Sequence, residues 1–123
     1  MPKNDLVPVR HMLDSAREAL SFIARKPPDS LRSDRLLALA CVRLLEIVGE
    51  AANQVSPEFR SAHPEIPWPK IIGMRNRLIH GYVEINLQTV WETLTVDLPP
   101  LIAALENILE PPTPPTQPAP HNP

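Results

Sequence analysis

The sequence predicts an all-α protein, an up-and-down bundle of four to five helices. Apolar residues recur at intervals of three and four along most of the chain, which is the period of an amphipathic helix. No segment alternates as a strand does, and Val-Glu-Ile at 83–85 is too short to count as one. Proline clusters separate the helical segments, because proline inside a helix removes a backbone hydrogen bond.

The first two helices are predicted from apolar stripes and from the residues that bound them. The first runs from about Asp5 to Lys26 and is ended by the proline pair at 27–28. Two candidate helix caps lie within residues 29–34, and the second helix then extends to about Val55 without a proline. Its apolar residues cover far more than one stripe, so we expect this helix to be central or shared with a second subunit.

A short helix and a rigid connector are predicted next. Ser56-Pro57-Glu58 is typical of a helix start, with a cap residue, a proline at the first position and an acid in the first turn. Three prolines between residues 63 and 69 then predict an extended connector, in which Trp68 packs on the core as an anchor.

Two further helices complete the predicted bundle. One runs from about Lys70 to His80, where Gly81 is a natural C-terminal stop. The other begins at Asn86, a good cap, and continues to about Glu110. The pair Pro99-Pro100 falls inside this last helix and is expected to kink it or split it in two.

The composition places a single helical domain at residues 5–110 and a Pro-rich tail at 111–123, which we expect to be disordered. No apolar run is long enough to cross a membrane, and the N-terminus lacks a signal core, so we expect a soluble cytoplasmic protein. Cys41 is the only cysteine and the four histidines are scattered, so we predict no metal site and no cofactor. The net charge of −2 argues against strong non-specific binding of nucleic acid, although every lysine and arginine lies in residues 1–80.

The predicted helix at 70–80 carries the polar residues that are candidates for a functional site. On a helical wheel Arg75 falls inside the apolar face, whereas Arg77 and His80 fall outside it. An arginine on an apolar face requires a carboxylate or a polar cleft, and Glu46 or Glu50 of the second helix is a candidate partner. Arg75 and His80 diverge by about 140° on an ideal helix, so they converge only if the helix ends at His80 or a second subunit completes the site.

Four segments resemble one family. Residues 75–82 fit the pattern Arg-x4-His-x-Tyr, which resembles the hallmark of the HEPN superfamily in its HepT-like branch. Residues 46–52 resemble the second-helix signature of that group, 63–68 its connector and 97–99 its last helix. The resemblance covers roughly residues 5 to 110, and the four segments occur in the order of the family.

The resemblance implies a HEPN-like helical bundle that forms a homodimer, with two Arg/His sets at one cleft. It implies a metal-independent endoribonuclease that acts on RNA as the toxin of a two-gene toxin–antitoxin module. The implied partner is an antitoxin of the minimal nucleotidyltransferase fold. In such families the antitoxin can transfer AMP units to the motif tyrosine, here Tyr82, and so silence the toxin.

The motif residues suit the cleavage of RNA by its own 2′-hydroxyl group. Histidine changes charge near neutral pH, so His80 is the candidate for moving the proton. Arg75 is the candidate cation against the negatively charged phosphorane, and Asn76 could hydrogen-bond a phosphate oxygen. AMP on Tyr82 would add bulk and negative charge where the RNA phosphate must enter.

Other residues have open roles. Glu50 is either a supporting counter-ion of Arg75 or an ordinary surface acid, and Lys70 and Arg77 either bind the RNA backbone or are simply solvated. Two alternatives to the ribonuclease toxin also remain. One is a non-catalytic dimeric helical module that binds a nucleotidyltransferase partner or a nucleotide, and the other is an inactive homologue.

Overall fold

The structure is a computed structural model, and it describes residues 4–80 and 84–110. Within them the chain is helical apart from one pair of two-residue strands, so the predicted all-α class is confirmed. The elements, in order, are α1 (Leu6–Ile23), α2 (Ser30–Ser33), α3 (Arg35–Asn53), α4 (Pro57–Ala62), α5 (Trp68–Ile72), α6 (Met74–Leu78), β1 (Ile79–His80), β2 (Glu84–Ile85), α7 (Leu87–Glu92), the π-helical turn η1 (Thr93–Asp97) and α8 (Leu98–Leu109).

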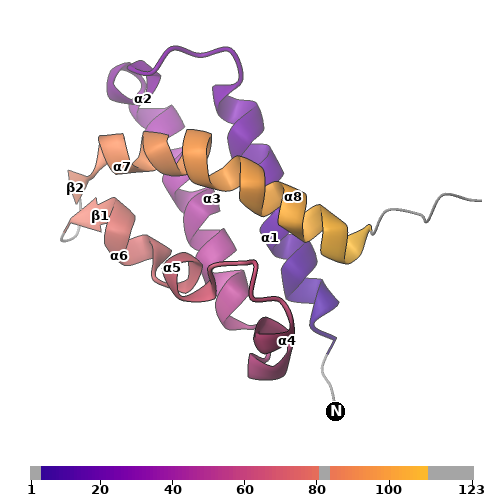
Figure 1. Ribbon diagram of the computed structural model, residues 1–123. Helices are drawn as coiled ribbons and strands as arrows, with labels where there is room; N and C mark the ends of the chain where they lie inside the picture. Colours follow the sequence, from indigo (N-terminus) through magenta and orange to yellow (C-terminus); the bar gives the residue numbers. More distant parts are fainter. Residues whose placement is uncertain (1–3, 81–83, 111–123) are drawn as a thin grey trace, which may run out of the picture.

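Helix α3 is the central element of the bundle, as its broad apolar surface predicts. It packs against α1 on one side and against α5 and α6 on another, while α8 lies across α1 (Figure 1). The chain runs up α1, down α3, back up through α5 and α6, and then returns across the molecule through α7, η1 and α8 (Figure 1). The core between these helices is built mainly from aliphatic side chains, among them Met12, Leu13, Leu45, Leu98 and Leu105.

The first two predicted helices begin where the sequence indicates, but both end two or three residues earlier than predicted. Helix α1 ends at Ile23 rather than at Lys26. The stretch after it forms two helices, because Asp34 adopts an extended conformation between α2 and α3. The Asp34 carboxylate caps α3 by accepting a 3.0 Å hydrogen bond from the backbone N–H of Leu37.

The short helix forms as predicted, whereas the extended connector does not: residues 63–67 pass through turns, and Trp68 and Pro69 already belong to α5. The Ser56 hydroxyl caps α4 by accepting a hydrogen bond from the Phe59 N–H, and it donates in turn to the Asp5 carboxylate at 2.8 Å. This contact joins the start of α1 to the start of α4. Trp68 is buried, and its indole N–H donates a 3.0 Å hydrogen bond to the carbonyl of His63, so its predicted anchoring role is confirmed.

The predicted helix from Lys70 to His80 is wrong in its extent and its continuity. It is interrupted at Gly73, which adopts a φ of −84° and a ψ of 14°, and α6 ends at Leu78. Residues 79–80 instead pair with 84–85 as antiparallel strands, in the register Ile79 to Ile85 and His80 to Glu84. The expectation of no strand is therefore also wrong, because two segments only a few residues apart pair with each other although neither has a strand pattern of its own.

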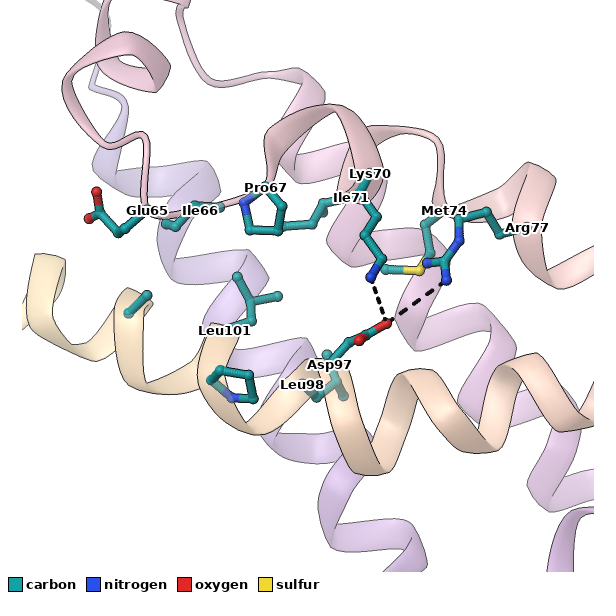
Figure 2. Close-up of a pocket in the computed structure, with 12 residues that line it drawn as sticks. Glu65, Ile66, Pro67, Lys70, Ile71, Met74, Arg77, Asp97, Leu98 and Leu101 are labelled. Atoms are coloured by element: carbon teal, nitrogen blue, oxygen red, sulfur yellow. Dashed lines mark ion pairs between the residues drawn. The ribbon is translucent and has the colours of Figure 1, made fainter.

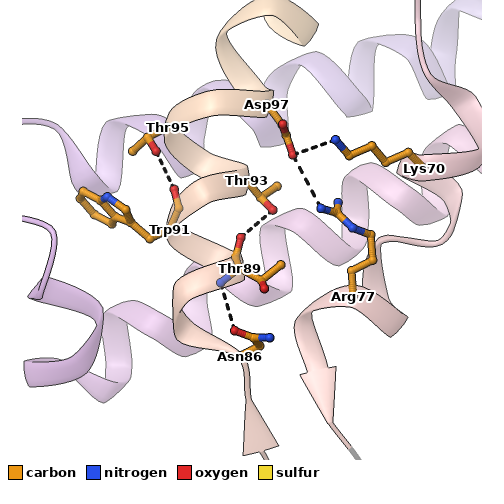
Figure 3. A network of polar contacts seen from close by, with 8 residues as sticks. All are labelled: Lys70, Arg77, Asn86, Thr89, Trp91, Thr93, Thr95 and Asp97. Carbon is orange, nitrogen blue, oxygen red and sulfur yellow. Dashed lines mark hydrogen bonds and ion pairs between the residues drawn. The ribbon is translucent and has the colours of Figure 1, made fainter.

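The last helix begins as predicted and is not split by its prolines. The Asn86 side chain accepts a 3.1 Å hydrogen bond from the Thr89 N–H and caps α7 (Figure 3). The chain then passes through η1 into α8, and the Leu98 N–H bonds to the carbonyl of Thr93, five residues back. This wider turn directly precedes Pro99 and Pro100, and a π-turn is one of the ordinary ways in which a helix accommodates such a disturbance.

Cys41 and two remaining expectations complete the description of the fold. Cys41 is fully buried, and this burial raises the pKa of its thiol to about 11. In the described ranges no helix is both long and apolar enough to cross a membrane. The expected disorder of residues 111–123 and the end of the motif at 81–83 lie outside the described residues.

Replacing Gly49 by alanine is expected to destabilise the fold by about 1–3 kcal/mol, as overpacking of a close contact does. A Cβ atom at position 49 of α3 would lie 2.7 Å from the carbonyl oxygen of Ile71 and 3.3 Å from the Cβ of Met74. Urea denaturation of the wild type and of Gly49→Ala measures the loss.

Gly73→Ala is the matched control, because the new Cβ would meet only the carbonyl of Pro69, at 3.3 Å, and the backbone φ is negative. A smaller loss of stability is expected for this variant. Equal losses at the two positions would contradict the assignment of Gly49 to the close approach of two helices.

Candidate functional site

The motif residues lie on a short segment that is held by two buried side chains. Met74 and Leu78 are buried at the two ends of α6 and fix the helix against the core. The residues between them project to different sides, because positions two apart on a helix differ by about 200°. Arg75 therefore faces α3, whereas Arg77 faces η1.

Arg75 is exposed, which corrects its predicted place on the apolar face. Its side chain is 61% exposed, and its Nε atom lies 3.3 Å from Oε2 of Glu46 on α3. The wheel placed it wrongly because it assumed one helix over residues 70–80, whereas α6 is a separate helix that begins after Gly73. The contact of the pair is made through Nε, and the Arg75 guanidinium donates no hydrogen bond within the described part of the chain.

Glu46 is the counter-ion of Arg75, and Glu50 is not. The Glu46 side chain is only 14% exposed and also lies 3.6 Å from Arg43 of the same helix. Glu50 instead pairs with Arg43, at 3.4 Å. The four side chains thus form one chain of alternating charge along the edge of α3, with Arg75 at its end. Of the two carboxylates that the sequence analysis named as candidate partners of Arg75, the less exposed one, Glu46, forms the pair.

His80 and Asn76 are both exposed, and Asn76 directly follows Arg75 on α6. His80 lies on β1 opposite Glu84 of β2, and its side chain points away from the side taken by Ile79. No hydrogen bond or ion pair joins Arg75 to His80 within the chain. The helix ends two residues before His80, so the wheel angle that separated the two residues no longer applies. Tyr82, the predicted modification site, lies outside the described residues.

Lys70 and Arg77, the two predicted contacts to RNA, converge on one carboxylate at the opposite edge of α6. Nζ of Lys70 lies 3.4 Å from Oδ2 of Asp97, and Nη2 of Arg77 lies 3.9 Å from the same atom (Figures 2 and 3). The three residues stand at one end of a cavity of about 220 Å³ with an apolar floor that includes Ile71 and Leu101. The structure therefore places this pair with Asp97 and not with Arg75.

Sequence reasoning missed Asp97 as a partner and did not choose Glu46. The spacing of Arg43, Glu46 and Glu50 is a detectable signal, because residues three, four and seven apart share one edge of a helix. Asp97 had no such signal, since it comes from an element far along the chain. As for metal ions, the ranges 4–80 and 84–110 hold no group of three or more His, Cys, Asp or Glu side chains placed to bind one.

Comparisons with known proteins point to one family. Residues 12–108 match the model of the family described as "Ribonuclease HepT-like". A protein of Caldanaerobacter subterraneus named "Putative RNase" is 43% identical over 102 residues, which are 83% of this chain and 91% of that protein. A "Probable ribonuclease HepT" of Thermococcus cleftensis is 37% identical over 75 residues, or 61% of this chain and 68% of that protein. No solved structure shows significant similarity to the chain.

The ion pair between Arg75 and Glu46 is expected to contribute little to stability. Arg75 is mostly exposed, and pairs of this kind are worth about 1 kcal/mol or less. A double-mutant cycle of Arg75→Gln and Glu46→Gln, measured by urea denaturation, should give a coupling energy in that range that falls as salt is added. A coupling of about 3 kcal/mol, independent of salt, would instead indicate a buried pair that is closed to substrate.

Proposed function

The chain belongs to the HepT-like ribonuclease family, and on this premise we propose that it is a metal-independent endoribonuclease, the toxin of a toxin–antitoxin pair. The observation that carries the proposal is the guanidinium of Arg75, which is mostly exposed and is approached by the carboxylate of Glu46 at Nε. An exposed guanidinium offers a planar fork of N–H donors that is suited to a phosphate. His80 leaves the same short segment two residues after α6 ends.

In the proposed reaction the RNA supplies its own nucleophile. His80 accepts the proton of a 2′-hydroxyl group, whose oxygen attacks the adjacent phosphorus. The Nη groups of Arg75 stabilise the negative charge of the phosphorane that forms. The bond from phosphorus to the 5′-oxygen then breaks, and that oxygen takes up a proton. The products are a 2′,3′-cyclic phosphate and a 5′-hydroxyl end.

The proposal includes a homodimer, in which two copies bring two sets of Arg75 and His80 to one cleft. Leu36 and Leu39 support it, because they are 77% and 44% exposed on the same edge of α3 that continues into Arg43 and Glu46. Large aliphatic side chains with this exposure are favourable contacts for a second subunit. With two histidines in one cleft, one would act as the general base that accepts the 2′-hydroxyl proton, and the other as the general acid that protonates the leaving oxygen.

The proposed partner is a nucleotidyltransferase-fold antitoxin that transfers AMP to Tyr82. This residue lies two positions after His80 in the sequence. A phosphate-linked group there would place negative charge beside the cationic site and exclude the RNA phosphate. The proposed regulation therefore acts on entry of the substrate and not on the fold.

A non-catalytic dimeric module that binds a nucleotidyltransferase partner or a nucleotide is the second candidate. One observation favours it, which is that no hydrogen bond or ion pair joins Arg75 to His80 within one chain. A scaffold would need the exposed surface of α3 and the exposed motif, but not convergence of the two side chains.

His80→Ala and Arg75→Ala are each expected to lower RNA cleavage in EDTA by at least about a hundredfold, the usual scale of general acid–base and phosphorane-stabilising groups. Arg75→Lys should retain part of the activity, since it keeps the charge but loses the fork. Cleavage of a labelled RNA is measured with each variant, and the intact mass of each protein is checked.

Arg17→Gln is the control, because Arg17 pairs with Glu106 at 2.7 Å on the surface between α1 and α8. Cleavage that survives His80→Ala, or that appears only with a divalent metal, would contradict the proposal. An inactive wild type with added AMP at Tyr82 indicates a silenced toxin, whereas an inactive and unmodified wild type favours the binding module.

The dimer is expected to depend on Leu36 and Leu39. Changing both residues to glutamate places charge in the proposed interface and should convert the dimer to a monomer, with loss of cleavage. Sedimentation velocity measures the assembly state. Leu6→Glu with Val7→Glu is the matched control, because these two residues are also exposed but lie at the start of α1. An unchanged dimer in the first double variant would contradict the assigned interface.

A further inference from the structure

Three adjoining hollows form a groove that leads away from Arg75. The first, of about 410 Å³, lies between α3 and the segment from Arg75 to Ile79 and includes Arg35. Leu39 also lines it, so this hollow borders the proposed dimer interface. The second, also of about 410 Å³, shares Arg35 and extends to Arg32. The third, of about 200 Å³, shares Arg32 and reaches Trp91 on α7. Neighbouring hollows share lining residues, which are Arg35 and Ile85 between the first two and Leu31, Arg32 and Leu87 between the second and the third, so the three adjoin one another.

The two arginines that join the hollows are available to an anionic ligand. Arg32 and Arg35 are exposed, and their guanidinium groups have no hydrogen bond or ion pair in the described ranges. Glu84 lines the same hollow but lies too far from both for an ion pair, and Glu46 already pairs with Arg43 and Arg75. The groove thus carries unpaired positive charge in a chain whose net charge is −2.

The position of Arg35 does not stabilise the helix that carries it. It is the first residue of α3, where the helix dipole places partial positive charge and disfavours a cation. Arg32 stands in the last turn of α2, where a cation is favoured, but it too has no carboxylate partner within the described residues. A ligand phosphate is the partner that both side chains lack.

Trp91 gives the far end of the groove an aromatic surface. Its ring projects from α7 on the side opposite Asp97, Lys70 and Arg77, so the groove is separate from that cluster (Figure 3). The ring is partly exposed in the hollow that it shares with Arg32 and Gln88. Trp68, in contrast, is buried and uses its indole N–H in the fold. An aromatic ring beside arginine is the usual combination for holding a base and its phosphate.

The length of the groove suits a short stretch of RNA. Arg35 and Glu46 are eleven residues apart on α3, which is roughly 16 Å at the helical rise. This span covers the first hollow only, and it holds no more than about five stacked nucleotides at about 3.4 Å each. We propose that this groove binds the single-stranded RNA that flanks the cut, with Arg35 and Arg32 on its phosphates and Trp91 stacked on a base. The inference rests on the proposed ribonuclease function and names the path of its substrate.

A binding measurement on protein that cannot cut tests the groove. In the His80→Ala background, a fluorescein-labelled 12-nucleotide single-stranded RNA is titrated and followed by anisotropy at several salt concentrations. Arg32→Gln with Arg35→Gln should weaken binding at least tenfold at low salt and reduce the slope of log affinity against log salt by about 1.4, or about 0.7 per lost phosphate contact. Trp91→Leu should weaken binding at least fivefold and abolish the quenching of tryptophan fluorescence by RNA, which Trp68→Phe should retain.

Arg10→Gln with Arg17→Gln is the matched control. It makes the same change in charge, but both residues pair with Glu110 at the α1–α8 surface, away from the groove. Binding within twofold of the parent is expected. Circular dichroism and thermal unfolding check that every variant is folded.

The outcomes separate this inference from the proposed function. Equal weakening by the two double variants overturns the inference, because it indicates overall charge alone. Unchanged RNA affinity, with a shift from dimer to monomer in Arg32→Gln/Arg35→Gln, also overturns it and assigns the groove to a second copy of the chain. A wild type that cleaves RNA while the groove variants bind normally refutes the groove only. A wild type that carries no AMP and never cleaves, yet binds RNA through these residues, supports the groove and refutes the nuclease.

Discussion

The close approach of α3 to the α5–α6 segment at Gly49 sets the geometry of the whole motif. Without a side chain at this position, the backbone carbonyl of Ile71 comes as near as 2.7 Å to where a Cβ would stand. Glu46 lies one turn before Gly49, and Arg75 directly follows Met74, which is the other contact of that glycine. The two helices are close enough for Glu46 to reach Arg75 because no side chain separates them at Gly49.

Helix α6 is held on its two sides by carboxylates from different elements. Glu46 of α3 engages Arg75, and Asp97 of η1 engages Arg77 together with Lys70. The side chains of Met74 and Leu78 are buried in the core and hold the helix against it. Such anchoring gives a five-residue helix, which would not be stable alone, a fixed orientation. The two arginines of α6 therefore differ in their surroundings. The side chain of Arg75 is mostly exposed to solvent, whereas Arg77 is partly enclosed in the lining of the cavity that also contains Asp97.

The features that could be predicted from the sequence are those that depend on local residues. The Asn86 cap, the Ser56 cap and the Trp68 anchor were predictable because each is set by side chains within a few positions. The break at Gly73 was not, because glycine within an apolar stripe is compatible with a continuous helix. The strands at 79–80 and 84–85 are too short to leave a pattern and exist only through their pairing.

The same limit applies to the candidate site. Glu46 and Glu50 share one edge of α3, so the sequence offered both as partners of Arg75, and only the approach of α6 distinguishes them. The groove residues Arg32, Arg35 and Trp91 come from three elements and carry no common motif.

The most direct test of whether RNA supplies its own nucleophile is to identify the ends of the RNA that is cleaved in EDTA. The same measurement is made with an RNA that carries a 2′-deoxy nucleotide at the cut. The proposed mechanism predicts a 2′,3′-cyclic phosphate and no cleavage of the deoxy substrate. Cleavage of the deoxy substrate at the same rate would contradict it.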